Sequence, residues 1–440
     1  MKNINKLIVI ITFLTAAGAP AQDNLTLSKS LELGLENSKD LKISNSKIIG
    51  SDANVEVVNS QFFPTLKFSA NYTRLSDVPP FQISLPIFPQ PITLAETILN
   101  NYTFKLAVQQ PIFTGFRLSS QKRSAEYLRD ATKIDYQKDK NEAALTIQTS
   151  FWNYEKALEV KTVVDDNIKT VEKHLQDTRN FYANGLATRN DVLKLEVQLS
   201  NTKLAELDAE NNIDLARTAF NKAVGLSLSA KTTISSPVIV VNDSYTEFSG
   251  LVNEAYNSRD ELRSTQERIK ANEESVSANK SGYFPQVFIN ADYYYNRPNS
   301  RYQPPLDQFK GTWDLGVTLS WDIWTWGSTS NQVIQAQQNL VQSKLTLDEI
   351  KDNIELEVNQ DYLALKYSKE KLEVLKETIE QAQENLKITD DKYNNQLATS
   401  SDLIDAENSV FTSETNYKTA LVDYQIAKVK LDKALGRKIY

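Results

Sequence analysis

Four segments of the chain alternate between apolar and polar residues. They cover residues 66–72, 102–109, 287–294 and 313–322. A period of two places the apolar residues on one face of a β-strand. Each segment has about ten residues, which is the length of a tilted strand across a bilayer. The pattern predicts four strands that suit a water-filled membrane barrel, although two soluble hairpins over a small core would alternate in the same way.

Helical patterns cover most of the remaining chain. Residues 118–184 and 328–395 contain neither glycine nor proline, which predicts helices on the order of 100 Å long at about 1.5 Å per residue. Helices of this length occur in coiled coils and helical arrays. Shorter helices are expected over 28–62, 188–224, 248–281 and 399–435. The last helix carries a heptad seam, formed by Leu403, Ala406, Val410, Ser413, Tyr417, Ala420, Tyr424, Ala427, Leu431 and Ala434.

The two halves of the chain repeat each other. "FYANGLATRNDVL" aligns with "KYNNQLATSSDLI" at an offset of 211 residues, so that Tyr182 corresponds to Tyr393. "SQFFPTLKFSANY" at Ser60 resembles "SGYFPQVFINADY" at Ser281, at an offset of 221. The difference arises from the proline-rich stretch "VPPFQISLPIFPQP" of the first half. Because insertions collect in loops, we expect that stretch to be a loop.

The duplication predicts the domain organisation. The first repeat spans 22–225, with an opening helix, a β-hairpin over 64–113 and a long helical hairpin over 117–225. Residues 226–247 form a linker, with one short strand at most. The second repeat spans 248–440, with a β-hairpin over 285–324 and a helical hairpin over 328–436.

The N-terminus has the pattern of an export signal. Residues 1–21 contain Lys2 and Lys6, then an apolar run, and end in Ala19-Pro20-Ala21. The apolar run is shorter than the roughly 18–20 residues that a membrane anchor needs. We therefore predict a cleaved secretory signal and a mature chain outside the cytoplasm.

Composition excludes several chemistries. The chain has no cysteine, one histidine, and 49 basic against 56 acidic residues, for a net charge of −7. Thiol catalysis and thiolate metal sites are impossible, and a multi-histidine metal site or a histidine-dependent triad is disfavoured. A net negative charge disfavours nucleic acid as the main partner, because binding to phosphates needs a basic surface. We expect no enzymatic activity, no metal and no cofactor, and we expect His174 at a solvated or interhelical position.

Four strands cannot close a membrane barrel. Such barrels need about eight strands, and open strand edges are not tolerated in lipid. Two chains would give eight strands, whose interior fills with side chains. Three chains would give twelve strands, which is wide enough to continue a helical tube. The sequence therefore predicts a homotrimer in contact with membrane lipid.

The order of these motifs resembles the TolC-like outer-membrane efflux family over nearly the whole mature chain. The resemblance rests on the duplicated helix–hairpin–helix plan, on the motifs "FFP" and "YFP" at the starts of strands, and on "QPIFTGF" and "WDIWTWG" at the ends of strands. The resemblance implies an α+β membrane protein: a trimeric 12-stranded β-barrel in the outer membrane, continued by a long α-helical barrel across the periplasm. The implied function is a passive exit duct for efflux or type I secretion.

The helical turns are the candidate site. Thr188 and Thr399 are each followed three residues later by an aspartate, Asp191 or Asp402, which suits helix capping. Capping alone would explain both aspartates. The resemblance adds a pore constriction at Asp402 and Asp405, with Tyr393 and Asp191 in the same gate, although Ala398 stands where the family has an arginine. The docking residues for an adaptor would be Leu186, Ala187, Thr188, Leu397, Ala398 and Thr399.

Aromatic residues at the strand ends suit a membrane interface, and the candidates are Tyr72, Tyr102, Trp313, Trp321 and Trp324. The partners implied by the resemblance are a periplasmic adaptor and an inner-membrane pump of the RND, ABC or MFS type. Two other interpretations remain open from the sequence. They are a periplasmic adaptor-like coiled-coil protein, and an extracytoplasmic enzyme or binding protein built on coiled coils.

Overall fold

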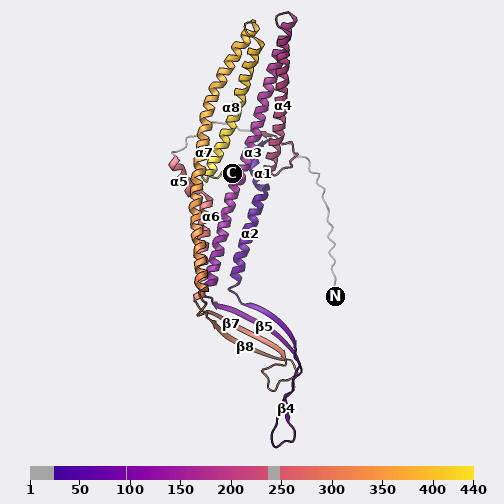
Figure 1. The fold of residues 1–440 in the computed structure, drawn as a ribbon, viewed down its shortest axis with the longest axis vertical. Coiled ribbons are helices and arrows are strands. Elements are labelled where there is room, and N and C mark those ends of the chain that lie inside the picture. The colour runs from indigo at the N-terminus through magenta and orange to yellow at the C-terminus, as the bar shows by residue number, and fades with distance from the viewer. Residues whose placement is uncertain (1–23, 96, 236–247) are drawn as a thin grey trace, which may run out of the picture. The chain divides into compact units, whose positions relative to one another are not determined.

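The computed structural model describes residues 24–95, 97–235 and 248–440 (Figure 1). The predicted signal over residues 1–21 lies outside this range. The chain divides into two compact units. Unit 1 comprises Met1–Leu41, Asp139–Ser258 and Leu356–Tyr440, and unit 2 comprises Lys42–Lys138 and Arg259–Glu355. Each unit therefore takes segments from both halves of the duplicated sequence.

Unit 2 contains the four strands expected from the alternating segments. They are β2 (Thr65–Arg74), β5 (Asn100–Phe113), β7 (Gln286–Arg297) and β8 (Lys310–Ser320), in the order β2-β5-β7-β8. All neighbours are antiparallel. In the described part of the chain, β2 pairs only with β5 and β8 only with β7. The sheet thus has two free edges.

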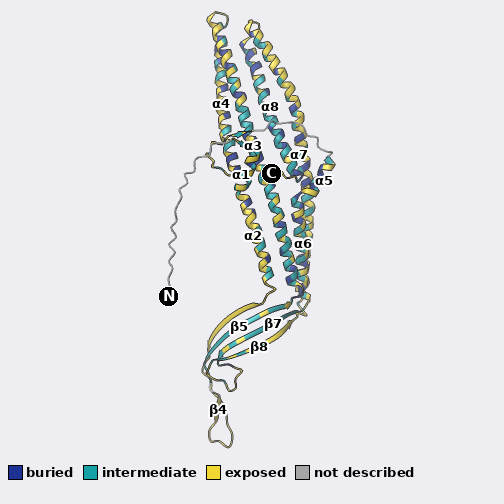
Figure 2. Ribbon diagram, turned by 180° about the vertical axis from the view of Figure 1, so that it is seen from behind, coloured by how far each residue is buried: buried dark blue, intermediate teal, exposed yellow. Residues whose placement is uncertain are grey.

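One face of this sheet is apolar and exposed. The register places Phe68 beside Leu106, Leu106 beside Tyr293, and Tyr293 beside Trp313. Phe68 is 66% exposed and Trp313 is 70% exposed, and the other two are also exposed. Figure 2 draws β8 as mostly exposed. A continuous apolar row of this kind on the surface of a sheet marks a face that contacts lipid or another protein.

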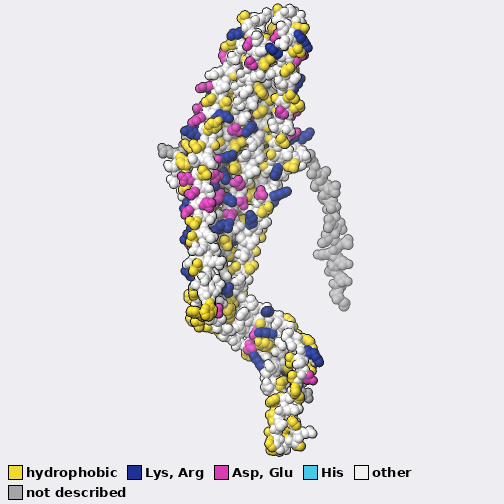
Figure 3. Space-filling model, in the orientation of Figure 1, with side chains coloured by type: hydrophobic (Ala, Val, Ile, Leu, Met, Phe, Trp, Pro, Cys, Tyr) yellow, Lys and Arg dark blue, Asp and Glu magenta, His cyan; other side chains and the backbone are white. Residues whose placement is uncertain are grey.

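The proline-rich stretch of the first half is not wholly a loop. Its strand β3 (Phe81–Ile83) pairs with β4 (Ile92–Ala95), which begins directly after the stretch, and the sequence did not predict this small hairpin. Pro80 and Pro91 directly precede the two strands, a position where proline removes no internal ladder bond. The hairpin region is rich in exposed hydrophobic side chains, with Ile87 86% exposed (Figure 3).

The long helices form as predicted. α3 (Arg117–Ala183) and α7 (Ser328–Asn394) have 67 residues each. They are followed by α4 (Arg189–Val224) and α8 (Ser400–Ala434). Most of the predicted seam of α8 is buried, including Leu403, Ala420 and Leu431. No helix of the described residues is both long enough and apolar enough to cross a membrane.

The opening helices are broken, so the prediction of one continuous helix in each repeat was wrong. The first divides into α1 (Leu27–Asn37) and α2 (Lys39–Ser60), the second into α5 (Phe248–Ser258) and α6 (Asp260–Lys280). Ser38 leaves the helical region at ψ 119°, and its Oγ accepts a hydrogen bond from the Leu41 N–H at 3.2 Å. Arg259 makes the corresponding break at ψ 124°. A serine that caps a new helix competes with helix continuation.

Short elements complete the fold. A 3₁₀ turn, η1 (Ser281–Tyr283), leads from α6 into β7. In unit 1, β1 (Leu25–Thr26) pairs in parallel with β6 (Ile234–Ser235), which lies in the predicted linker. The rest of that linker, residues 236–247, lies outside the described range.

Aromatic residues of α3 and α4 centre the core of unit 1. Phe151 and Tyr154 of α3 pack with Phe220 of α4, and Val422 of α8 joins them. Leu31 and Leu35 of α1 cover this cluster. Figure 2 shows buried positions recurring along these helices. The core therefore joins both helical hairpins of the duplicated chain.

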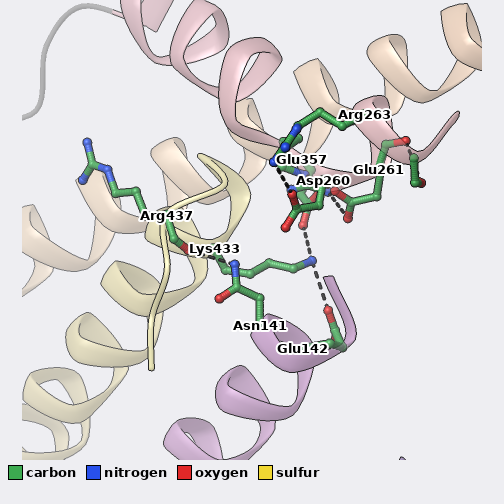
Figure 4. A network of polar contacts seen from close by, with 10 residues as sticks. Asn141, Glu142, Asp260, Glu261, Arg263, Glu357, Lys433 and Arg437 are labelled. Carbon is green, nitrogen blue, oxygen red and sulfur yellow. Dashed lines mark hydrogen bonds and ion pairs between the residues drawn. The ribbon is translucent and has the colours of Figure 1, made fainter. Parts of the chain in front are cut away.

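Polar contacts fix the C-terminal segment to α3. The Asn141 side chain donates to the Arg437 carbonyl oxygen at 2.9 Å and accepts from the Ile439 N–H at 3.3 Å. Lys433 pairs with Glu142 of α3 and Glu357 of α7 (Figure 4). Arg437 pairs with Glu254 and Asp432, and these two carboxylates raise the pKa of its guanidinium.

The glycines of the opening helices provide a test of this packing. A Cβ at Gly34 would lie 2.5 Å from Cδ1 of the buried Ile147, whereas a Cβ at Gly50 meets nothing within 4 Å. Overpacking costs about 1–3 kcal/mol, and at Gly34 we expect it to exceed the gain of about 1 kcal/mol that alanine brings to a helix. Gly34→Ala should lower the thermal unfolding midpoint in detergent and Gly50→Ala should raise it. Stabilisation by both would contradict the close approach of α1 to α3.

Candidate functional site

Two helical turns with the same backbone geometry connect α3 to α4 and α7 to α8. Gly185 and Gln396 have φ values of 74° and 63° at equivalent points. After each, the N–H of Leu186 donates to the Phe181 carbonyl oxygen, and that of Leu397 to the Lys392 carbonyl oxygen, both at 2.8 Å. These bonds satisfy helix-end carbonyls in the manner of a Schellman motif.

The docking candidates lie on these turns. Leu397 is 77% exposed and Leu186 is also exposed. Ala187 and Ala398 are half-buried, and Thr188 and Thr399 are exposed. The turns thus present one leucine each to the surroundings of the chain.

Thr188 and Thr399 cap the following helices, as predicted. The Thr188 N–H donates to Oδ2 of Asp191 at 2.9 Å, and the Asp191 N–H donates to Oγ1 of Thr188 at 3.3 Å. Thr399 and Asp402 make the same reciprocal pair at 2.8 and 3.2 Å. Both are capping boxes.

These hydrogen bonds also set the charge of the aspartates. Ser400 and then Thr188 lower the pKa of Asp191 by hydrogen bonding to its carboxylate. The Thr399 hydroxyl and backbone lower the pKa of Asp402 in the same way. Hydrogen bonds donated to a carboxylate stabilise its ionised form, so both aspartates are anions at neutral pH.

The two turns are joined to each other within the chain. The Ser400 hydroxyl donates to Oδ1 of Asp191 at 2.6 Å. Lys194 Nζ donates to Oγ of Ser401 at 2.7 Å. An open groove of about 430 Å³ runs between α4 and α8. Its lining residues include Lys194 and Asp405, together with Leu193, Val197 and Ile404.

Tyr393 joins α7 to α3. Its hydroxyl lies 2.6 Å from Oγ1 of Thr178, and its ring packs edge-on against Phe181 at 5.9 Å between centroids. Burial raises the pKa of the Tyr393 phenol. In the single chain Tyr393 is therefore a buried link between helices. No local sequence pattern indicates the roles of Thr178, Ser400 and Ser401, because their partners lie about half the chain away.

His174 is interhelical, one of the two positions expected for it. It is 5% exposed and contacts Glu407 of α8 and Asp390 of α7. Among the described residues, no group of three or more histidine, aspartate or glutamate side chains has a metal-binding arrangement.

The predicted interface aromatics all lie in or next to the sheet of unit 2. Tyr72 and Tyr102 pack across β2 and β5 with ring centroids 5.0 Å apart. Trp313, Trp321 and Trp324 are exposed. Indole Nε1 of Trp321 donates to the Tyr283 carbonyl oxygen at 3.2 Å.

Comparison with known proteins gives matches along both repeats. The model of the family "Outer membrane efflux protein" matches residues 31–226 and 251–437. Outer membrane efflux protein BepC of Brucella suis biovar 1 is 21% identical over 434 residues, which cover 97% of this chain and 88% of BepC. Outer membrane protein TolC of Escherichia coli is 22% identical over 349 residues, covering 77% of this chain and 70% of TolC. The crystal structure of VceC from Vibrio cholerae superposes with a TM-score of 0.78 at 17% identity, covering 94% of this chain and 97% of that one.

The capping boxes predict an acid response. Because the folded pKa values of Asp191 and Asp402 are lowered, their contribution to stability is complete above the ordinary carboxyl pKa of about 4 and is lost as the pH falls through the lowered values. Amide protection in the first turns of α4 and α8, corrected for intrinsic exchange, should therefore be constant from about pH 6 to about pH 4 and should drop as the pH falls further. Asp191→Asn with Asp402→Asn keeps an acceptor that does not titrate, so its protection should not depend on acid. An equal acid loss in that variant would refute the assignment.

Proposed function

The chain belongs to the outer membrane efflux protein family, and from this membership we propose that it is the passive exit duct of a tripartite efflux or type I secretion system, gated at its helical turns. The family resemblance expected from the sequence is confirmed. The protein is an outer-membrane channel that extends into the periplasm, it has the fold of such channels, and it is not an enzyme. Our proposal concerns the gate, the partner proteins and the oligomeric state.

A homotrimer with a shared twelve-stranded barrel is the proposed assembly. The observation that supports it is the sheet of unit 2, in which β2 and β8 each have one unpaired edge among the described strands. A bilayer offers no hydrogen bonds to such edges. The exposed row Phe68, Leu106, Tyr293 and Trp313 supplies an apolar outer face for lipid. The repeats 22–225 and 248–440 would each contribute two strands and one helical hairpin to the assembly.

The proposed gate is a ring of carboxylates from Asp402 and Asp405 of three chains. Asp402 is exposed and ionised at the start of α8, and Asp405 lies one helical turn later. Carboxylate rings select for cations in narrow pores. Tyr393 and Asp191 would act through the contacts that connect α7 to α3 and α4 to α8.

An adaptor and an inner-membrane pump are the proposed partners. The sequence contains no nucleotide-binding loop of the G-x-x-x-x-G-K-[ST] type, so the energy must come from a partner. We place adaptor docking on the turns, where Leu186 and Leu397 are exposed. The match to both repeats disfavours the alternatives of an adaptor-like protein and of an enzyme.

Neutralising the carboxylates tests the gate. Asp402→Ala with Asp405→Ala should raise single-channel conductance in planar bilayers and lower cation over anion selectivity by roughly tenfold, because the local field falls. Asp402→Asn with Asp405→Asn should do the same while keeping an oxygen for the cap. Glu380→Ala with Glu384→Ala, two exposed carboxylates of α7, is the matched control and should change neither property. Unchanged ion selectivity and unchanged block by multivalent cations in these variants would contradict the proposed carboxylate ring.

Charged substitutions on the turns test the docking site. Leu186→Glu with Leu397→Glu should weaken binding of the adaptor encoded beside this gene by about tenfold or more, since a buried leucine contributes about 1.5–3 kcal/mol. Bilayer conductance should not change. Leu85→Glu, at an exposed leucine outside the turns, is the control. Normal adaptor binding by the double variant would place docking elsewhere.

A further inference from the structure

A cluster of three ionisable groups, of which His174 and Glu407 are buried and Asp390 is half-buried, joins three helices of unit 1. His174 of α3 lies between Glu407 of α8 and Asp390 of α7. Glu407 is 2% exposed, and its Oε2 atom has no hydrogen-bond partner among the described residues. A buried carboxylate is unfavourable unless a cation or donors neutralise it. The imidazole of His174, which carries a positive charge only when protonated, is in contact with Glu407.

Both ring nitrogens of His174 face a carboxylate. Nδ1 contacts Oε1 of Glu407 closely, and Nε2 lies 3.4 Å from Oδ1 of Asp390. A neutral imidazole has one donor nitrogen and one acceptor nitrogen. In either neutral tautomer, a lone pair would point at a carboxylate oxygen. The geometry therefore suits a cluster that holds one additional proton, on the ring or shared with Glu407.

The duplicated sequence explains why this cluster exists. At the offset of 211 residues, Glu407 corresponds to Glu196 and Asp390 corresponds to Arg179. Arg179 and Glu196 form an ion pair between α3 and α4 at 2.9 Å. In the second hairpin the arginine is replaced by a carboxylate, so the equivalent positions carry like charges. His174 supplies from α3 the cation that the second hairpin lacks.

Among the described residues, the neighbouring groups named here have other partners or are themselves negative. Tyr393 of α7 is bonded to Thr178, whose hydroxyl also donates to the His174 carbonyl oxygen at 2.8 Å. Asp177 of α3 and Asp191 of α4 act on Tyr393 as negative charges. The nearby cations Lys203 and Arg179 pair with Glu172 and Glu196. Leu175 packs on Val192 and Leu195, which covers the α4 side with apolar groups.

We propose that His174, Glu407 and Asp390 form a proton-dependent clasp that holds α3 against the α7–α8 hairpin near the mouth of the duct. The protonated clasp favours a closed mouth, and its deprotonation favours separation of the hairpin from α3. The mouth itself belongs to the proposed function, and the contact between helices does not depend on it. Loss of the additional proton would leave a ring nitrogen of His174 with its lone pair toward a carboxylate oxygen, so the clasp would couple opening to periplasmic pH.

The absence of cysteine allows a direct measurement of the clasp. Lys173→Cys of α3 and Ser409→Cys of α8 place spin labels at exposed positions of the full-length chain. The distance between the labels should be short and narrowly distributed at about pH 5.5, and longer or broader at about pH 8.5. We expect the ratio of closed to open populations to shift by about tenfold or more, as is usual for a hydrogen bond to a charged group. Bilayer conductance should rise over the same pH interval.

Three variants separate the clasp from general effects of pH. His174→Gln should give the alkaline distance at both pH values. Asp390→Arg gives Glu407 a permanent cation, as in the first hairpin, and should remove the pH response. Lys418→Gln breaks a different bond between α8 and α3, the 2.7 Å pair with Glu159, and should leave the response intact.

Each outcome bears on one claim. A distance that does not change with pH in the unmodified chain, or a change that persists in His174→Gln, overturns the clasp. A pH-dependent distance in a chain that forms no pores supports the clasp and contradicts the proposed duct. Pores whose conductance and label distance both ignore pH support the duct and contradict the clasp.

Discussion

The hydrogen-bonding capacity of two strand edges constrains the whole molecule. β2 and β8 close the sheet of one chain at either side, and each leaves one edge without a partner in the described structure. In water such edges can be solvated, but the exposed apolar row from Phe68 to Trp313 indicates a face that water does not cover. A sheet that must avoid water on its face and cannot satisfy its edges in lipid is incomplete alone. This constraint extends to the helices, because each pair of strands is followed in the chain by a 67-residue helix, α3 or α7.

The duplicated chain is symmetric in its backbone and asymmetric in its charges. Both turns have a left-handed residue at the same position, Gly185 or Gln396, followed by an equivalent helix-end hydrogen bond and a Thr-Asp capping box. The side chains differ where function is proposed: Lys194 corresponds to Asp405, and Arg179 corresponds to Asp390. Both changes make the second hairpin more acidic. The first hairpin therefore keeps the Arg179–Glu196 ion pair, whereas the two equivalent carboxylates of the second hairpin both contact His174 of α3.

The sequence predicted those features that depend on short-range pattern. The four strands follow from strict alternation, and the long helices from the absence of glycine and proline over 118–184 and 328–395. The breaks at Ser38 and Arg259 were missed because the helical pattern continues across them; the Ser38 side chain caps the new helix, whereas Arg259 makes no side-chain cap. The β3–β4 hairpin was missed because its strands are short and surrounded by prolines. Tyr393–Thr178 and His174–Glu407 join residues 215 and 233 positions apart, and no local period encodes such pairs.

Capping and pore lining place different demands on the two aspartates of the second turn. Asp402 uses Oδ2 for both the backbone N–H and the hydroxyl of Thr399, which leaves Oδ1 without a hydrogen bond in the described structure. An ion in the pore could contact that oxygen while the cap stays intact. The carboxylate of Asp405 has no part in the cap and lines the groove that also contains Lys194. Because a cap residue is needed for helix stability with or without a pore, Asp402 alone is weak evidence for a constriction. Asp405 has no structural task of that kind, and its charge is therefore the better indicator of a gate.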